Sequence, residues 1–349
     1  MRIAHILWSL GTGGAENMVV DITTEQVKSN DVALFVINDW VDDYLYSKID
    51  KHVRVFLLHR KAGGRSILPI LKLNLLLAKF RPDIIHTHSF QLINLILYPF
   101  GKRVRTIHNT HNDPVEYPRF DKLISISKTV KDFTTRQGFD SVEIDNGIVA
   151  KKICYKPMKA FTDGKHHFVQ VSRLAIEQKG QDILLHALSV LVERYNFEDF
   201  VLHLIGDGED RAVLENMVDD LHLQGKVIFE GQKPQPWIYQ NLCNYDLFIQ
   251  PSRYEGFGLT VAEAMAAKVP VLVSNIEGPM EIIGDGKFGM SFVSEDADDC
   301  ARQIKMFCDA PNLKVREEAY QHVIAKYDVS VTARKYLEVY KQLMDNERK

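Results

Sequence analysis

The stretch PSRYEGFGLTVAEAMAAKVPVL, residues 251–272, places one glutamate in a glycine-bearing loop and a second in the helix-like run that follows. These are Glu255 and Glu263, eight positions apart. The preceding segment DLFIQPS has the apolar character of a buried strand, and so does VPVLVS at the end of the stretch. A strand, a loop, a helix and a second strand make a βαβ unit, so this stretch predicts a parallel sheet.

The same alternation extends in both directions. Strand-like segments before it are IAHILW, VALFVI, VRVFLL, DIIHTH and RVRTIH, followed by a second series of HHFVQVSR, FVLHLIGDG, KVIFEG, DLFIQPS and VPVLVS. Helix-like segments, including 15–28, 67–80, 90–100, 180–194 and 209–221, separate many of them. The pattern predicts an α/β protein with two doubly wound Rossmann-like domains facing across a cleft. Ligands of such sheets bind at the carboxyl ends of the strands.

The domain boundaries follow from breaks in this pattern. Residues 147–165 interrupt both series and read as a linker. We therefore expect a first domain over 1–155 and a second over 165–328. The last stretch, 329–349, has a helical pattern and is expected to pack back on the first domain.

Composition limits the function classes. The chain has 349 residues and a net charge of −3, so no basic excess indicates nucleic acid. Its four cysteines, Cys154, Cys243, Cys300 and Cys308, lack the spacing of metal ligands and are expected to be reduced thiols. No apolar run approaches the roughly 20 residues of a spanning helix, and the first residues lack the core of a signal peptide. We expect a cytoplasmic protein.

The loop that carries Glu255 has the chemistry of a phosphate and sugar site. Its two glycines allow the backbone to approach a ligand closely, and a helix that starts after such a loop attracts anions. The amides of Gly258, Leu259 and Thr260 are therefore expected to face a phosphate. A carboxylate accepts hydrogen bonds from two sugar hydroxyls at once, so Glu255 and Glu263 could hold two different sugar rings.

The segment EGFGLTVAEAMA resembles the signature of the retaining GT-B glycosyltransferases of family 4, in which seven residues separate two glutamates. Further segments match the family over nearly the whole chain: GTGGAE (11–16), IDNGI (144–148), VSRLAIEQKGQDILLHAL (171–188), LIGDGEDRAVLE (204–215) and VIFEGQ (227–232). The resemblance implies transfer of a sugar from a nucleotide-diphosphate donor to an acceptor hydroxyl, with the anomeric configuration kept. It also implies that the domain over 1–155 binds the acceptor and that the domain over 165–328 binds the nucleotide sugar.

The resemblance also implies roles for single residues. Arg173 and Lys179 match the cations that clamp the donor diphosphate, where fixed positive charge stabilises the leaving group. Glu255 matches the glutamate that contacts the donor sugar, and Glu263 the one that binds the ribose. Without the surrounding segments, the same side chains would be read as solvated surface cations, a loop carboxylate and an ordinary helix glutamate.

The expected donor site is larger than these four residues. It comprises Gly13, Gly14, Arg173, Lys179, Gly206, Glu230, Glu255, Gly256, Phe257, Gly258, Leu259, Thr260 and Glu263. The loop GTGGAE lacks the last glycine of the dinucleotide pattern, so a plain tight turn is the alternative for Gly13 and Gly14. In the family, backbone atoms bind the base of the donor, which is most commonly uracil and next guanine. The identity of the base therefore cannot be inferred from the side chains of this sequence.

Histidines gather at the strand ends of the first domain. The resemblance implies that His108, which closes RVRTIH, lies beside the donor sugar. His88 and His111 are predicted to contact the acceptor, whereas a packed structural role suits His86 equally well. The clustered acids of a metal motif are absent here and the family generally lacks a catalytic metal, so we expect no metal and no cofactor. The expected catalytic residues are His108, Arg173, Lys179 and Glu255.

The mechanism implied is a front-face route. A double displacement needs a carboxylate nucleophile on the far face of the sugar, and the resemblance does not supply one. In the front-face route the departing phosphate oxygen helps to take the acceptor proton. The protein then contributes positioning and charge stabilisation.

The first half of the chain is the more basic one, with 19 Lys and Arg against 16 Asp and Glu in residues 1–150. Residues 59–81 combine cations with a strongly apolar helix, which is typical of an interfacial helix on anionic lipid. A helix buried against the sheet has the same composition, and 90–100 shares this ambiguity. The predicted partners are a nucleotide-diphosphate sugar, most simply a UDP-sugar, and a saccharide or lipid-linked acceptor of polysaccharide assembly. Peripheral association with the inner face of the cytoplasmic membrane is one expectation.

Two other functions fit the same architecture. A nucleotide-sugar epimerase of similar fold would turn over the donor without an acceptor, although the arrangement of Glu255 and Glu263 does not resemble that class. A non-catalytic nucleotide-sugar-binding protein would keep nucleotide affinity without transfer, and the presence of Arg173 and Lys179 argues against it.

Overall fold

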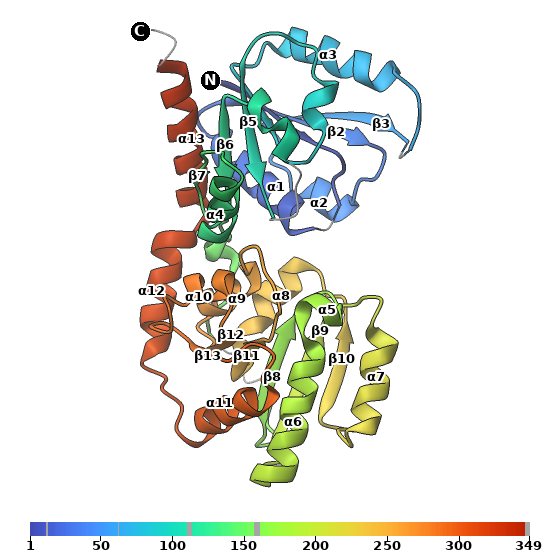
Figure 1. Ribbon diagram of the computed structural model, residues 1–349. Helices are drawn as coiled ribbons and strands as arrows, with labels where there is room; N and C mark the ends of the chain where they lie inside the picture. The colour runs from blue at the N-terminus through green and yellow to red at the C-terminus, as the bar shows by residue number, and fades with distance from the viewer. Residues whose placement is uncertain (12, 62, 110–113, 157–160, 346–349) are drawn as a thin grey trace. The chain divides into compact units, whose positions relative to one another are not determined.

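The computed structural model describes residues 1–345 apart from 12, 62, 110–113 and 157–160, and divides into two compact units (Figure 1). Unit 1 consists of residues 1–147 and 328 onward, and unit 2 of residues 148–327. Residues 148–155, which we predicted in the first domain, therefore belong to unit 2. The chain changes unit at residues 147–148 and again at 327–328. These two points are neighbours, because Ile148 N donates to Tyr327 O at 2.7 Å.

Unit 1 is built on a seven-stranded parallel sheet in the order β3-β2-β1-β4-β5-β6-β7. Its strands are β1 (Arg2–Leu7), β2 (Asp31–Asn38), β3 (Arg54–Arg60), β4 (Ile84–Thr87), β5 (Lys102–Ile107), β6 (Lys122–Ser125) and β7 (Val142–Glu143). Its helices are α1 (Gly14–Gln26), α2 (Asp43–Ser47), α3 (Leu68–Phe80), α4 (Lys128–Arg136) and α13 (Val329–Asp345), with 3-10 turns η1 (Leu92–Leu95) and η2 (Pro114–Arg119).

Unit 2 repeats this plan with a six-stranded parallel sheet in the order β10-β9-β8-β11-β12-β13. Its strands are β8 (His166–Val171), β9 (Phe200–Ile205), β10 (Val227–Gly231), β11 (Leu247–Gln250), β12 (Val271–Ser274) and β13 (Met290–Phe292). Its helices are α5 (Ile176–Lys179), α6 (Gln181–Tyr195), α7 (Arg211–Asp220), α8 (Gln235–Asn241), α9 (Leu259–Ala266), α10 (Glu277–Ile282), α11 (Ala297–Asp309) and α12 (Val315–Tyr327), with 3-10 turns η3 (Ala150–Lys152) and η4 (Leu242–Asn244).

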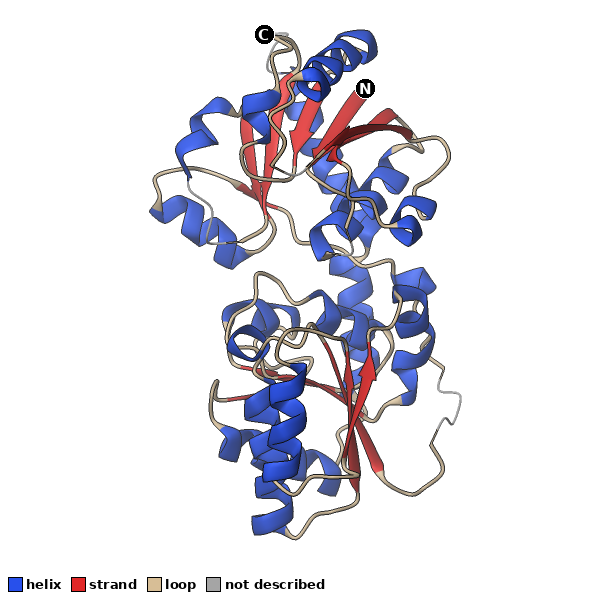
Figure 2. Ribbon diagram, turned by 90° about the vertical axis from the view of Figure 1, so that its right-hand side faces the viewer, coloured by secondary structure: helices blue, strands red, loops and turns tan. Residues whose placement is uncertain are grey.

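Both sheets are covered by helices on both faces (Figure 2). The central strands are consequently buried along nearly their whole length, as in β1, β2, β8 and β9. Parallel strands between two helical layers need continuous apolar runs, which explains why the apolar segments of the sequence located these strands correctly. The predicted α/β class with two Rossmann-like domains is confirmed.

The sequence signal fails where elements are short. Strands β6, β7 and β13 have four, two and three residues and were not predicted, because so few residues show no periodicity. The helix predicted over 90–100 is wrong, since only η1 is helical there. Asn74 Oδ1 accepts the backbone N–H groups of Leu97 at 2.7 Å and Tyr98 at 2.9 Å, and Pro99 has none to donate.

The strand orders create one switch point in each unit. In unit 1 the helical connections diverge between β1 and β4, and in unit 2 between β8 and β11. At such a point the loops at the carboxyl ends of the two strands separate and leave room for a ligand. The loops after β1, β4, β8 and β11 are therefore the places to examine for a site.

The last helix completes unit 1. α13 packs against α1, and its buried Tyr340 and Tyr336 reach side chains of the sheet. Tyr340 OH lies 2.5 Å from His86 Nδ1, and Tyr336 OH lies 3.1 Å from Thr106 Oγ1. Among the described residues, no helix has the length and apolar character needed to cross a membrane.

Candidate functional site

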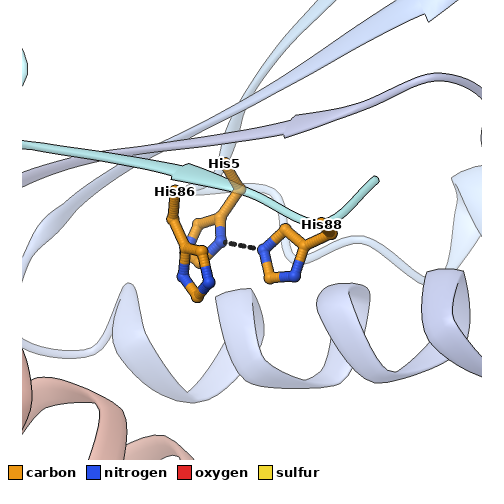
Figure 3. A group of neighbouring side chains, drawn as sticks. All are labelled: His5, His86 and His88. Atoms are coloured by element: carbon orange, nitrogen blue, oxygen red, sulfur yellow. Dashed lines mark hydrogen bonds between the residues drawn. The ribbon is translucent and has the colours of Figure 1, made fainter. Parts of the chain in front are cut away.

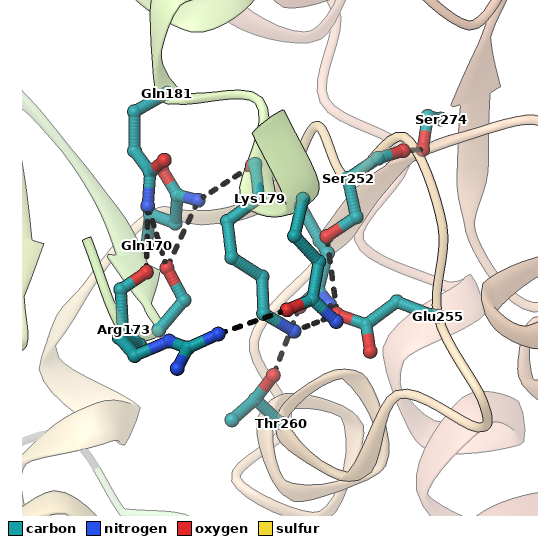
Figure 4. A network of polar contacts seen from close by, with 11 residues as sticks. Gln170, Arg173, Lys179, Gln181, Ser252, Glu255, Thr260 and Ser274 are labelled. Atoms are coloured by element: carbon teal, nitrogen blue, oxygen red, sulfur yellow. Dashed lines mark hydrogen bonds and ion pairs between the residues drawn. The ribbon is translucent and has the colours of Figure 1, made fainter. Parts of the chain in front are cut away.

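Lys179 and Glu255 meet at the switch point of unit 2. Lys179 is the last residue of α5, after β8, and Glu255 lies in the loop after β11. The Lys179 Nζ atom donates to Glu255 Oε1 at 2.5 Å, with the two side chains only 17% and 10% exposed (Figure 4). The fold thus brings together two of the predicted catalytic residues.

A polar network holds the Glu255 carboxylate. Its Oε1 atom also accepts from Gln250 Nε2 at 2.6 Å and from Ser252 Oγ at 3.1 Å. Thr260 Oγ1 donates to Gln250 Oε1 at 2.9 Å, which ties the first turn of α9 to the same network. These donors to Glu255 all converge on Oε1, and Oε2 receives no hydrogen bond from the described residues. Oε2 is therefore the oxygen that can accept from a ligand hydroxyl.

Two buried glutamines fix the backbone that carries the predicted cations. Gln170 Nε2 donates to Lys179 O at 3.2 Å, and Gln181 Nε2 donates to Arg173 O at 2.9 Å (Figure 4). Both glutamines also donate to Ser172 Oγ, at 3.2 and 3.1 Å. The loop after β8 is thereby pre-organised by one glutamine from β8 and one from the start of α6, as a site for a charged leaving group requires.

Gly180 allows the two loops to approach each other. Its φ is +64°, in the left-handed region, and a Cβ atom there would lie 2.1 Å from the carbonyl oxygen of Pro251. No side chain fits at that distance. The close approach of Gly180 to Pro251 is what places Lys179 beside Glu255.

Arg173 and Arg253 border the same hollow but differ in their partners. The hollow, about 570 Å³, is lined by residues of the loops after β8, β9 and β11. Arg253 makes a two-pronged ion pair with Asp182, at 2.9 and 2.7 Å. Arg173 is exposed, bonds Gln178 Oε1 at 3.3 Å and pairs with no carboxylate among the described residues. Arg173 is thus the cation available to an anionic ligand.

The start of α9 supplies amides beside this network. Gly258 precedes the helix with a φ of +106°, and Leu259 and Thr260 form its first turn. The Phe257 side chain, 3% exposed, instead packs edge-on against Tyr327 in the core, so only its backbone could contact a donor. Gly256 is half-buried in the loop.

Glu263 lies deeper than Glu255. It is 8% exposed, and the Tyr239 hydroxyl donates to its Oε1 at 3.2 Å. A buried glutamate on a helix needs a hydrogen-bonding role, so it is not an ordinary surface residue.

The remaining donor-side predictions of unit 2 lie at the ends of β9 and β10. Gly206 has a φ of +143°, and a Cβ atom there would meet Ser172 O at 1.9 Å. Its N–H donates to Gly231 O at 3.0 Å. The Glu230 carboxylate is engaged by His203 at 3.0 Å and Lys233 at 3.2 Å. The Glu230 side chain is therefore already engaged within unit 2.

In unit 1, the glycines predicted for the donor lie at the start of α1. Gly13 precedes the helix with an ordinary φ of −67° and Gly14 is its first residue. A Cβ atom on Gly13 would lie 2.3 Å from Glu16 Oε2, so a side chain there would displace this glutamate. Burial raises the pKa of Glu16, against the lowering effect of its own backbone N–H. The glycine keeps room for a carboxylate at the amino end of the helix.

Three buried histidines form a cluster (Figure 3): His5 in β1, His86 in β4 and His88 directly after β4. His5 Nδ1 lies 2.9 Å from His88 Nε2, and His5 Nε2 lies 2.7 Å from Gln26 Oε1. The His86 ring bonds Tyr340 through Nδ1 and Thr106 Oγ1 through Nε2, the latter at 2.7 Å. His86 therefore has the packed structural role.

These histidines lie close enough for each to offer one ring nitrogen to a metal ion. Five of the six ring nitrogens already have hydrogen-bond partners, and His88 Nδ1 is the sixth. Burial lowers the pKa of His5 to about 4, against the raising effect of its bond with Gln26. Burial also holds the pKa of His86 and His88 well below the ordinary value. The arrangement is that of neutral rings in a polar core network, and the expectation that no metal is used stays a prediction.

His108 directly follows β5 next to this cluster, with its ring centroid 6.0 Å from that of His88. Its Nε2 atom is buried without a partner among the described residues. Burial, reinforced by the charge of Arg105, lowers the pKa of His108 to about 4. A neutral ring with an unused nitrogen suits a hydrogen bond to a sugar hydroxyl. His88 is buried and its Nε2 is bonded to His5, so only its Nδ1 could contact an acceptor. His111, the other histidine predicted to contact the acceptor, lies outside the described residues.

The sequence missed the polar side chains that organise the site. Gln170, Ser172, Gln181, Gln250 and Ser252 hold Lys179 and Glu255 in place, and none was predicted. A signal existed for two of them, because Gln170 and Gln250 are polar residues that directly follow apolar residues in buried strands. Such residues cost free energy unless they are hydrogen-bonded, so they mark a required network.

Two protein families match the chain, one for each unit. Residues 155–322 match the glycosyl transferases group 1, and residues 12–151 match glycosyltransferase family 4. The two matches together span most of the chain.

Curated relatives point the same way. The chain is 24% identical over 322 residues to N-acetylgalactosamine-N,N'-diacetylbacillosaminyl-diphospho-undecaprenol 4-alpha-N-acetylgalactosaminyltransferase of Campylobacter jejuni, covering 83% of this chain and 85% of that protein. It is 23% identical to lipopolysaccharide 1,6-galactosyltransferase of Salmonella typhimurium, covering 93% and 92%. Other relatives match over less than two thirds of their own length, such as an uncharacterized glycosyltransferase of Methanocaldococcus jannaschii, 28% identical, with 64% of this chain and 60% of that protein covered.

Solved structures share the fold at low identity. The Anabaena protein HepE, crystallised in complex with UDP and glucose, matches with a TM-score of 0.83 and 19% identity, covering 98% of this chain and 100% of that one. Sucrose-phosphate synthase of Thermosynechococcus elongatus matches with a TM-score of 0.80 and 18% identity, covering 99% and 100%. Since a glycosyltransferase family matches each unit, and the fold is the one these structures share, the chain belongs to the glycosyltransferases of the family 4 type.

Proposed function

We propose that this glycosyltransferase moves a hexosyl group from a UDP-sugar to a hydroxyl of a saccharide or lipid-linked acceptor, with the anomeric configuration kept. The contact of Lys179 with Glu255 at the switch point of unit 2 carries the proposal. It puts a fixed cation and a carboxylate with one unused oxygen where a parallel sheet binds its ligand.

The donor side of the proposal assigns each group a task. Lys179 and the exposed Arg173 neutralise the diphosphate as it leaves, together with the first amides of α9. The Oε2 atom of Glu255 accepts a hydroxyl of the donor sugar, and Glu263 accepts the ribose hydroxyls. No carboxylate nucleophile is needed, since the departing phosphate oxygen takes the acceptor proton in the front-face route.

The choice of UDP has two supports. Uracil is the commonest base of the family that the chain resembles, and the Anabaena neighbour was crystallised with UDP and glucose. The choice of acceptor rests on relatives named for diphospho-undecaprenol and lipopolysaccharide sugars. Work at the inner face of the cytoplasmic membrane, as a peripheral protein, is part of the same proposal.

Thermal unfolding with UDP, GDP, ADP and CMP, each at millimolar concentration, is the first test. A ligand that binds only the folded protein stabilises it by about 2.7 kcal/mol at a hundredfold excess over its dissociation constant. We expect UDP to raise the midpoint and the other three to leave it unchanged. A shift with GDP alone would mean that the base is guanine and not uracil. No shift with any of the four nucleotides would contradict the proposed nucleotide site.

The reaction itself is tested by incubating UDP-hexoses with saccharide acceptors and recording the NMR spectrum of the product. An α-linked product from an α-linked donor supports a retaining transferase, and a β-linked product contradicts it. Conversion of the donor to a different sugar without acceptor would favour an epimerase. Nucleotide binding without any turnover would favour a non-catalytic binding protein.

A further inference from the structure

We propose that unit 1 carries a docking surface for an anionic lipid bilayer, which we call the α3 surface. It consists of Leu68, Leu71, Leu75, Leu97 and Phe100, together with Lys72 and Lys79. The inference rests on unit 1 alone and does not depend on the chemistry at Glu255. It gives the proposed use of a lipid-linked acceptor a physical place of contact.

The first observation is the exposure of leucines along one side of α3. Leu68, Leu71 and Leu75 are 70%, 53% and 71% exposed. Their spacing of three and four residues puts them on one helical face. The opposite face carries Leu73, Leu77 and Phe80, which are buried in the core of unit 1. The helix therefore has two apolar faces, and only one of them has a partner among the described residues.

The second observation is that a neighbouring segment extends the apolar face. Leu97 and Phe100 are 66% and 68% exposed. Asn74, on the side of α3 next to the leucines, accepts from the backbone N–H groups of Leu97 and Tyr98 and donates to Leu95 O at 2.9 Å. These bonds fix the segment against the helix. The exposed apolar side chains thus belong to neighbouring segments of unit 1 and are not scattered single residues.

The third observation is the charge. Residues 51–103 contain ten Lys and Arg and a single acid, Asp83. Asp83 is occupied by Arg2, whose backbone N–H donates to it at 2.7 Å. Lys72 and Lys79 follow Leu68 and Leu75 by one helical turn, so they lie on the leucine face. Acids outside this range pair with Arg54 and Lys102, at 3.9 and 4.0 Å. Lys72 donates to Leu57 O at 3.5 Å, and neither Lys72 nor Lys79 pairs with a carboxylate among the described residues. Apolar side chains bordered by such cations fit the boundary between acyl chains and anionic headgroups.

The charge also decides between a bilayer and a second copy of this chain. A symmetric dimer through the α3 surface would bring the same surface of both copies together, lysines included. Like charges facing each other in a partly desolvated contact repel. An anionic bilayer instead complements them, and its interior accepts leucines without requiring a shaped partner.

The test is flotation with vesicles at physiological salt, using phosphatidylcholine alone and phosphatidylcholine with phosphatidylglycerol. We expect binding to the anionic vesicles and none to the neutral ones. Since each lysine near a charged membrane surface contributes about fivefold, Lys72→Gln with Lys79→Gln should lower the partition coefficient about 30-fold. Leu71→Ser with Leu75→Ser should lower it at least about tenfold. All four positions are solvent-exposed, so these variants keep the fold.

Matched controls lie in unit 2. Val213→Ser with Met306→Ser removes two apolar side chains that are 48% and 56% exposed, and Lys305→Gln with Lys314→Gln removes two lysines. Both controls should bind vesicles like the wild type. The response of thermal unfolding to UDP should be the same in every variant, which separates this proposal from the proposed function.

Three results would overturn the proposal. The first is no flotation of the wild type with anionic vesicles. The second is equal flotation of the α3-surface variants and the wild type. The third is a wild-type dimer in sedimentation that Leu71→Ser with Leu75→Ser turns into a monomer, which would assign this surface to a second copy.

Discussion

Lys179 and Glu255 are 76 positions apart in the chain, yet Nζ of the first lies 2.5 Å from Oε1 of the second. The contact exists because β8 and β11 are adjacent parallel strands whose carboxyl ends carry the two residues. Gln250 and Ser252 hold Glu255 in this orientation through their own hydrogen bonds. A donor would then meet a cation and a carboxylate that are already oriented, which avoids reorganisation during the reaction.

Replacing Lys179 by alanine is expected to lower kcat by about 10²- to 10³-fold, the usual cost of removing one charge-stabilising group. Stability should fall by about 1–3 kcal/mol, because Glu255 keeps Gln250 and Ser252 as donors. Steady-state kinetics and chemical denaturation measure the two effects. Lys314→Ala, at an exposed lysine just before α12, is the control and should change neither kcat nor stability. A Lys179→Ala enzyme with wild-type kcat would remove Lys179 from the site.

Arg173 and Arg253 should respond differently to substitution by alanine. Arg173→Ala removes an exposed cation, so stability should change by less than about 0.5 kcal/mol while UDP affinity falls about 10- to 100-fold. Arg253→Ala breaks the two-pronged pair with Asp182 and should cost about 1–3 kcal/mol in stability. Calorimetric titration with UDP and urea denaturation distinguish them. Equal UDP affinity in Arg173→Ala and the wild type would contradict the assignment.

Gly180→Ala should destabilise unit 2 by more than about 3 kcal/mol, since its Cβ would lie 2.1 Å from Pro251 O and its φ is +64°. Gly225→Ala is a matched control, because its φ is +74° and nothing lies within 4 Å of the added Cβ. The Gly225→Ala variant has the unfavourable φ but no steric clash, so it should lower the free energy of unfolding by about 1 kcal/mol. Urea denaturation of both variants measures the difference. If they were equally stable, the contact with Pro251 would not be what fixes this loop.

The stability of unit 1 should depend on pH through its buried histidines. Burial lowers the pKa of His5 and of His108 from 6.5 to about 4, so the folded protein binds fewer protons than the unfolded chain between these values. The free energy of unfolding should therefore fall as the pH falls from about 6.5 to 4, by up to about 1.4 kcal/mol per pH unit for each histidine. Denaturation curves between pH 7 and pH 5 measure this slope.

Replacing single histidines tests whether the buried histidines cause the pH dependence of the unfolding free energy. His5→Gln should make the pH dependence shallower than in the wild type, whatever it does to stability at pH 7. His186→Gln on α6 replaces an exposed histidine and should leave the slope unchanged. A wild-type slope in His5→Gln would show that this ring does not titrate on unfolding.

The sequence predicts the sheets well because the physics that forms them is local. Central strands must be apolar along their length when helices cover both faces, and the runs around Ile3, Val32 and Phe168 satisfy this. The loop from Glu255 to Gly258 was readable for a similar reason, since its glycines and the helix after it lie together in the chain.

The features that could not be predicted from the sequence depend on contacts between residues far apart in the chain. His5 joins His86 and His88 only because β1 pairs with β4, and nothing near His5 in the chain signals this. Segment 90–100 is apolar enough for a helix, yet Asn74 captures the backbone N–H groups of residues 97 and 98. The orientation of Glu255 likewise depends on Lys179, which lies at the end of α5 and is distant from Glu255 in the chain.

The return of the chain to unit 1 through α13 has a consequence for biosynthesis. The side chains of Tyr336 and Tyr340 complete the hydrogen bonds of Thr106 and His86 inside the first sheet. These residues leave the ribosome only after all of residues 148–327 have done so. Unit 2 is continuous in sequence and can fold as soon as it emerges, whereas unit 1 must wait with an incomplete core. The half that is synthesised first is therefore the half that matures last, and until then it is the part of the nascent chain most in need of a chaperone.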